Sequence, residues 1–187
     1  MSLKIVQFNE PILRKKGSKI TAFNATLRKL ADAMIETMHD AEGIGLAAQQ
    51  IGQAIQLCVV DLRPVESKFG WEYDGTRPPL ELFMPLALVN PEIVRSSRQM
   101  MTLWDDCFSF PDLAVKLKRH LSVEVRYRDP EGKEHRLKTR GALSELLQHE
   151  IDHVNGILAL DRAVDSKHIV YKSEIEKLKL VTARKEM

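Results

Sequence analysis

Residues 148–153 read Gln-His-Glu-Ile-Asp-His, and this run constrains the fold more than any other segment of the chain. Apolar residues recur around it at helical spacing and predict a helix from about Ala142 to Val154, with Gly156 as its stop. On such a helix His149 and His153 project from one face and can bind the same ion. The rest of the chain is therefore predicted to wrap around this helix.

A catalytic metal site usually has three protein ligands and one open position for water, so the two histidines need a partner. Cys107 is the predicted third ligand, because its neighbours are polar and a thiolate binds divalent iron, zinc, cobalt or nickel strongly. Glu150 follows the first histidine and is placed to move protons for the water that such an ion activates. Ordinary surface or core roles are the competing interpretation, which the joint pattern on one helix disfavours.

Two further residues near these motifs have ordinary interpretations. Asp152 either faces solvent or pairs with a basic residue such as Arg119. Cys58 lies inside the apolar run of residues 57–60 and is predicted to fill the core. A disulfide between Cys58 and Cys107 is not expected in a reducing compartment.

The remaining pattern is that of a mixed α+β domain. Asn24 can cap a helix that should end near Gly43, and strands are predicted over residues 55–61, 86–94, 99–103, 121–127 and 133–138. A last amphipathic helix is predicted over residues 167–180. The expected fold is α+β, with short antiparallel strands packed around a central metal-binding helix, a C-terminal helix, and one catalytic domain over residues 1–187.

Residues 62–85 read as a long excursion between strands, because they contain four prolines and two glycines. The excursion also holds four aromatic residues, Phe69, Trp71, Tyr73 and Phe83. These side chains could line a pocket or pack on the sheet, and packing is slightly favoured.

Composition excludes several classes of function. A formal net charge of +2 on 187 residues gives no reason to expect a polyanionic partner such as DNA. No apolar run approaches the ~20 residues needed to cross a bilayer, and the N-terminus shows no signal peptide. A cytoplasmic protein with no membrane partner is expected.

Three segments, taken together, resemble the motifs of the peptide deformylase family. They are residues 43–52 (GIGLAAQQIG), residues 105–109 (DDCFS) and residues 148–153 (QHEIDH). Supporting matches occur at residues 10–14 and 89–93, as EPILR and VNPEI. The likeness extends from about residue 3 to residue 160, and its order and spacing make the joint match far more specific than any single motif.

The resemblance implies a hydrolase that removes the formyl group from the initiator methionine of nascent polypeptides and releases formate. By likeness, Cys107, His149 and His153 bind one divalent metal ion, which in the family is natively Fe²⁺ and often replaced by Zn²⁺, Ni²⁺ or Co²⁺. An N-formylmethionyl peptide is then the expected partner. The family's last helix is associated with docking at the ribosome, but the mixed charges here are more typical of a solvated face.

Further roles follow from the same resemblance. Glu150 is similar to the family's general acid and base, and Gln50 matches the glutamine whose amide polarises the formyl oxygen. The backbone N–H of Phe108 would be the second donor to that oxygen. Substrate contacts are implied for Gly43, Ile44, Gly45 and Asp106. Without the resemblance, Gln50 reads as a loop residue and residues 43–45 as a tight turn.

The chain departs from the family pattern at four positions, where Gln49, Asp105, Asp106 and Phe108 replace proline, glutamate, glycine and leucine. Asp106 is the largest change, because glycine adopts positive φ angles that cost other residues energy, and because it adds a charge near the metal. No proposed metal ligand is lost.

These departures leave two alternatives open. The first is a deformylase-like amidohydrolase that acts on another N-acyl substrate. The second is a binding protein that holds N-terminal peptides without turnover. A general metalloprotease is least favoured, because its third ligand would not be a cysteine from a strand or loop.

Overall fold

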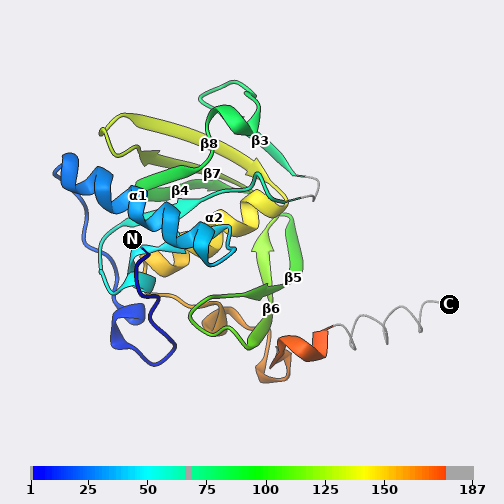
Figure 1. Cartoon of the computed structure of the whole chain (residues 1–187). Coiled ribbons are helices and arrows are strands. Elements are labelled where there is room, and N and C mark those ends of the chain that lie inside the picture. The colour runs from blue at the N-terminus through cyan, green and yellow to red at the C-terminus, as the bar shows by residue number, and fades with distance from the viewer. Residues whose placement is uncertain (1, 66–68, 176–187) are drawn as a thin grey trace.

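The computed structural model describes residues 2–65 and 69–175, and it arranges two antiparallel sheets around helix α2 (Ala142–Val154). Helix α2 packs against β1, β2, β4 and β8 of the larger sheet and against β6 of the smaller one (Figure 1). The predicted fold class and the predicted central helix are both confirmed, and the helix has the predicted bounds.

The larger sheet has six strands in the order β1-β2-β4-β7-β8-β3, and every neighbouring pair is antiparallel. Its strands are β1 (Gly45–Ala47), β2 (Leu57–Val60), β3 (Gly70–Tyr73), β4 (Leu86–Ser96), β7 (Ser122–Arg128) and β8 (Glu134–Arg140). The smaller sheet has the order β5-β6-β9, with β5 (Met100–Asp106), β6 (Leu113–His120) and β9 (Ile169–Tyr171). Strand β1 and strand β5 therefore each form one edge of a sheet.

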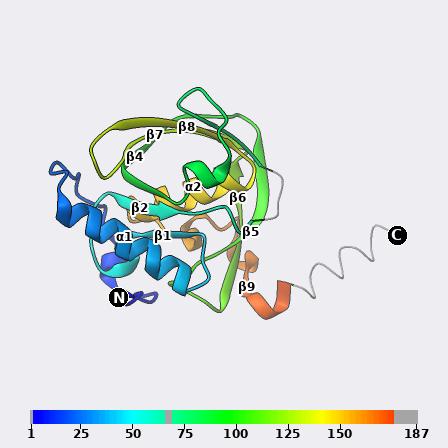
Figure 2. The ribbon, with the colours of Figure 1, turned by 45° about the horizontal axis from the view of Figure 1, so that its top comes forward.

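The two faces of the larger sheet are covered by different helices. Helix α1 (Ala25–Asp40) packs on one face of β1 and β2, and α2 packs on the other (Figure 2). Strand β2 is buried on both faces, since Leu57 belongs to the core under α1 and Cys58 to the core under α2. The predicted cap of α1 is confirmed, because Asn24 Oδ1 accepts hydrogen bonds from the backbone N–H groups of Thr26 and Leu27 at 3.0 and 3.1 Å.

The predicted start of the C-terminal helix is wrong. Residues 169–171 form β9, which pairs with β6, and helical backbone begins only at Lys172. An available sheet edge satisfies the backbone groups of this segment, and amphipathic spacing over a few residues does not reveal such an edge. Residues 176–180 of the predicted helix lie outside the described residues.

The segment over residues 62–85 contains regular structure that was not predicted. It includes β3 and a short 3₁₀ helix, η3 (Leu80–Leu82). Its four aromatic side chains, Phe69, Trp71, Tyr73 and Phe83, pack against the core on the α2 side of the sheet. The packing interpretation is thus confirmed. Within residues 2–65 and 69–175, no helix has the length and apolar character that a membrane crossing requires.

Candidate active site and metal centre

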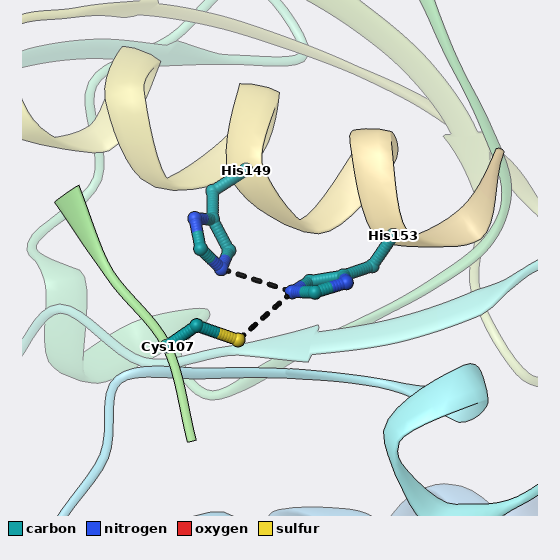
Figure 3. Close-up of side chains that lie close together, drawn as sticks. All are labelled: Cys107, His149 and His153. Atoms are coloured by element: carbon teal, nitrogen blue, oxygen red, sulfur yellow. Dashed lines mark hydrogen bonds between the residues drawn. The ribbon is translucent and has the colours of Figure 1, made fainter. Parts of the chain in front are cut away.

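The three predicted metal ligands meet at the centre of the molecule. His149 and His153 lie on one face of α2, and Cys107 directly follows the last residue of β5 (Figure 3). His153 Nε2 lies 3.1 Å from His149 Nε2 and 3.2 Å from Cys107 Sγ. All three side chains are buried, and their ligand atoms lie within 4.8 Å of one another.

This arrangement fits a divalent transition-metal ion. Metal–ligand bonds of about 2.0–2.3 Å in a tetrahedron place neighbouring ligand atoms about 3.3–3.7 Å apart, close to the spacings found here. One thiolate and two imidazoles suit iron, cobalt, nickel or zinc. Three protein ligands leave a further position for water or substrate. The donor set thus defines a candidate catalytic metal centre.

A chain of buried charges holds His149 in place. Asp105 Oδ1 lies 2.8 Å from His149 Nδ1, and Asp105 Oδ2 accepts a hydrogen bond from Arg119 at 2.9 Å. Burial alone would raise the pKa of Asp105, but the charges of His149 and Arg119 outweigh it and lower that pKa below its ordinary value. A carboxylate on the second ring nitrogen fixes the tautomer that leaves Nε2 free for a metal.

Arg119 extends this chain to a second carboxylate. Its other guanidinium nitrogen bonds to Asp152, which confirms the predicted pair, and Arg162 also binds Asp152 with two hydrogen bonds of 2.6 Å. The Arg119 side chain is only 2% exposed. The side chains of its carboxylate partners, Asp105 and Asp152, are 3% and 10% exposed.

Replacement of Arg119 by methionine is expected to lower the free energy of unfolding by about 3–5 kcal/mol, because it leaves two buried carboxylates short of a partner. Denaturant unfolding of variants with matched metal content measures this change. Arg126→Met is the control, since Arg126 makes a 2.7 Å pair with Glu92 at the surface, and exposed pairs of this kind contribute little to stability. Equal losses in the two variants would contradict a structural role for the buried chain.

Glu150 has the geometry of a group held ready for proton transfer. Its carboxylate is buried, and Oε2 has no hydrogen-bond partner among the described residues. Burial raises its pKa to about 7. Gly45 makes room for this carboxylate, because a Cβ at Gly45 would lie 2.2 Å from Glu150 Oε1.

Gln50 is oriented by its own surroundings. Its Oε1 accepts a hydrogen bond from the backbone N–H of Ala47 at 2.8 Å, and its Nε2 points at Cys107 Sγ at 3.4 Å. Gln50 lies in a short 3₁₀ helix, η2 (Ala48–Ile51), rather than in the loop that its sequence predicted. The neighbouring Gln49, in place of the family's proline, is buried and donates to the carbonyl of Val154 at 3.1 Å, which ties this segment to α2.

A cavity of about 430 Å³ opens beside these groups, within the usual range for ligand sites. It lies between the two sheet edges, since Gly43, Ile44 and Gly45 line one side and Trp104 to Phe108 the other. The predicted tight turn at residues 43–45 is wrong, because Gly45 already belongs to β1. The ring of Phe108 fills the space beside Gly43, where a Cβ would lie 2.0 Å from its Cζ.

Asp106 causes no backbone conflict. It is the last residue of β5 and pairs with Ala114 of β6, so its backbone is extended and needs no positive φ. Its side chain is 61% exposed at the edge of the cavity.

Several residues that line the cavity were not singled out from the sequence. They are Glu42, Trp104, Glu145, Leu146 and Lys172. Glu145 could have been found, because it precedes His149 by four residues on the same helix face. Lys172 gave no signal, since only the pairing of β9 with β6 brings it to the site.

The fold and the ligand set together define a metal-dependent hydrolase, and comparison with known proteins identifies its family. Residues 2–168 match the model of the family described as polypeptide deformylase. The chain is 46% identical over 183 residues to a peptide deformylase of Opitutus terrae, which covers 97% of this chain and 95% of the relative.

Solved structures of peptide deformylases superpose on this chain. A peptide deformylase from Thermotoga maritima superposes with a TM-score of 0.76 at 31% identity, covering 88% of this chain and 99% of its own. A class I type b peptide deformylase from Acinetobacter baumannii, with Met-Ala-Ser bound, gives a TM-score of 0.75 at 30% identity, covering 87% and 98%. The chain belongs to the polypeptide deformylase family, and the predicted enzyme class, a hydrolase of protein biosynthesis, is confirmed.

Proposed function

We propose that this chain removes the formyl group from the N-terminal methionine of nascent polypeptides, with Cys107, His149 and His153 as metal ligands. The observation that carries the proposal is the convergence of the three buried ligand atoms beside the unpartnered carboxylate of Glu150. A bound divalent ion would supply Lewis-acid chemistry and make water nucleophilic near neutral pH. The natural ion in this proposal is Fe²⁺, with Zn²⁺, Ni²⁺ or Co²⁺ as functional substitutes.

Glu150 handles the protons of the reaction. In the first step it accepts a proton from the attacking water at its unpartnered Oε2, which the lack of any competing hydrogen bond in the described residues supports. In the second step it gives that proton to the amine of the departing peptide, and formate is released. The carboxylate is buried at the inner end of the cavity, which limits its contact with bulk water.

Gln50 and Phe108 stabilise the negative charge that forms on the formyl oxygen. The Gln50 amide is held by Ala47 so that its N–H₂ group faces the metal centre. The backbone N–H of Phe108, one residue after Cys107, is the second donor. Donors fixed before the reaction starts cost no reorganisation when the charge develops.

Replacement of Gln50 by alanine is expected to lower kcat by about a hundred- to a thousandfold, as loss of one oxyanion donor typically does. Gln50→Glu, which keeps the acceptor for Ala47 but loses the N–H₂ donor, should be as slow. Formate release at saturating peptide measures both. Gln49→Ala is the control. It should lower the free energy of unfolding and leave kcat near that of the wild type, because Gln49 bonds to Val154 and does not line the cavity. A kcat near that of the wild type in both Gln50 variants would contradict this role.

The substrate backbone is proposed to bind between the two sheet edges. Residues 43–45, which lead into β1, and Asp106, the last residue of β5, line the cavity, and an extended peptide can add a strand to the open edge of β1 or β5. The Met-Ala-Ser bound to the Acinetobacter baumannii relative is a peptide of this kind. In this proposal residues 1–187 form one catalytic domain that works in the cytoplasm and can dock at the ribosome.

No observation favours the two alternatives, a changed acyl specificity or binding without turnover. Formate release from formyl-Met-Ala-Ser, beside acetate release from acetyl-Met-Ala-Ser, tests all three. Turnover of the formyl peptide alone is expected. Turnover of the acetyl peptide at a similar rate would favour the amidohydrolase. Tight peptide binding by the metal-loaded protein with neither product would favour the binding protein.

A further inference from the structure

An ion pair spans the rim of the substrate cavity. Lys172 Nζ lies 2.7 Å from Asp106 Oδ2, and both residues line the cavity. Their side chains are 39% and 61% exposed, so both charges can be reached from solvent and by a bound peptide.

The fold fixes Lys172 at this place. Strand β9 pairs with β6 beside β5, and the register sets Val170 opposite Ala114, whose other partner is Asp106. The backbone N–H of Lys172 then donates to the carbonyl of Asp112 at 2.8 Å. Lys172 lies beyond residue 168, where the match to the family model ends, and Asp106 stands where the family pattern has glycine. The pair therefore joins a position where the chain departs from the family motif to a residue beyond the family match.

The charges around the cavity are unequal. Among the described residues that line it, Lys172 is the only lysine or arginine, whereas Glu42, Glu145, Glu150 and Asp106 are acidic. Asp105 also lines the cavity, but it pairs with the guanidinium of Arg119. Lys172 therefore offsets part of an acidic rim, and its loss would leave Asp106 unpaired.

We propose that Asp106 and Lys172 select formylated peptides by the charge of the two residues that follow the methionine, with a preference for basic over acidic side chains. This inference rests on the proposed function. A peptide bound along β5 passes Asp106 one residue from the metal ligand Cys107, so the pair meets the residues just after the reacting one. A basic side chain can bind Asp106 in place of Lys172, while an acidic one must face the remaining carboxylates of the rim.

The test compares kcat/KM for formyl-Met-Lys-Lys, formyl-Met-Gln-Gln and formyl-Met-Glu-Glu amides at low ionic strength. The wild-type chain should prefer the lysine peptide to the glutamate peptide. We define the charge preference as the ratio of kcat/KM for the lysine peptide to kcat/KM for the glutamate peptide. Lys172→Met should raise this ratio by about fivefold, and Asp106→Asn should lower it by about fivefold, as expected for single charges near a protein surface. Both shifts should shrink in 0.5 M salt, chosen because the Debye length there is only about 4 Å.

Lys138→Met is the matched control, because Lys138 forms a 2.6 Å pair with Glu72 and does not line the cavity. Its ratio should equal that of the wild type. A ratio that stays constant in both rim variants, while all proteins still cleave the glutamine peptide, would overturn this inference and leave the proposed function standing. Failure of the wild-type chain to cleave the glutamine peptide would overturn both.

Discussion

Replacement of Glu150 by glutamine is expected to lower kcat for formate release by about a hundred- to ten-thousandfold, the usual contribution of a positioned general acid and base. Glutamine has nearly the same shape, so the contact with Gly45 is preserved while the ability to carry a proton is lost. Metal content should stay that of the wild type, because Glu150 is not among the three converging ligands. Anaerobic assays at saturating formyl-Met-Ala-Ser measure the change.

Glu145→Gln is the matched control for this prediction. Glu145 lies on the same helix, lines the same cavity and has a pKa that burial also raises to about 7. Its loss should lower kcat by less than about tenfold, because general acid–base catalysis needs the group within hydrogen-bond reach of the reacting proton. Equal losses of kcat in the two variants would contradict a specific role for Glu150 in proton transfer.

Replacement of Cys107 by alanine is expected to abolish turnover through loss of the metal. Removal of a residue that only hydrogen-bonds to a metal ligand costs about 10–100-fold in metal affinity. The loss of a direct thiolate ligand should therefore lower the metal affinity by more than about a hundredfold. Competition with a chelator measures the affinity. Thermal unfolding gives a second readout, because an ion that binds only the folded state raises Tm, and this rise should vanish in the variant.

Cys58→Ala controls for the removal of a buried cysteine. Cys58 lies in β2 within the core, and neither cysteine forms a disulfide. The variant should lose some stability to the small cavity it creates, but its metal affinity and the metal-dependent rise in Tm should remain. A Cys107 variant that still bound one ion with wild-type affinity would remove Cys107 from the ligand set.

The sequence predicted those parts of the fold whose signals are local. The helix over Ala142–Val154 was predicted with its observed bounds, because apolar spacing, the histidine pair and a following glycine agree. The cap at Asn24 and the hairpin of β7 and β8 likewise depend on neighbouring residues. The aromatic residues of segment 62–85 are predicted to pack on the sheet, and they do so as partly buried side chains.

Strands β1, β3, β6 and β9 are not among the predicted strands. Strands β1, β3 and β9 have three or four residues each and exist because another strand offers an edge, whereas β6 has eight residues and is the hairpin partner of β5. No local pattern in 169–171 distinguishes such a strand from the first turn of an amphipathic helix. Lys172 reaches the cavity only through this pairing, so its contact with Asp106 had no trace in the sequence.

The residues of the candidate site divide in the same way. His149, His153 and Glu150 are linked by helical spacing, and Cys107 follows from the need for a third ligand of suitable chemistry. Gln50 drew attention only through the family resemblance. The pair of Arg119 and Asp152 was predicted as one of two possibilities, but its extension through Asp105 to His149 required the three-dimensional arrangement.

The most direct test of a single-metal deformylase is an anaerobic titration of the metal-free protein with Fe²⁺, in which formate release from formyl-Met-Ala-Ser and bound iron are measured on the same samples. We predict that activity rises in proportion to bound iron and stops rising at one ion per chain. Full activity before iron is added, or one tightly bound ion per chain with no formate released, would contradict the function proposed for this site.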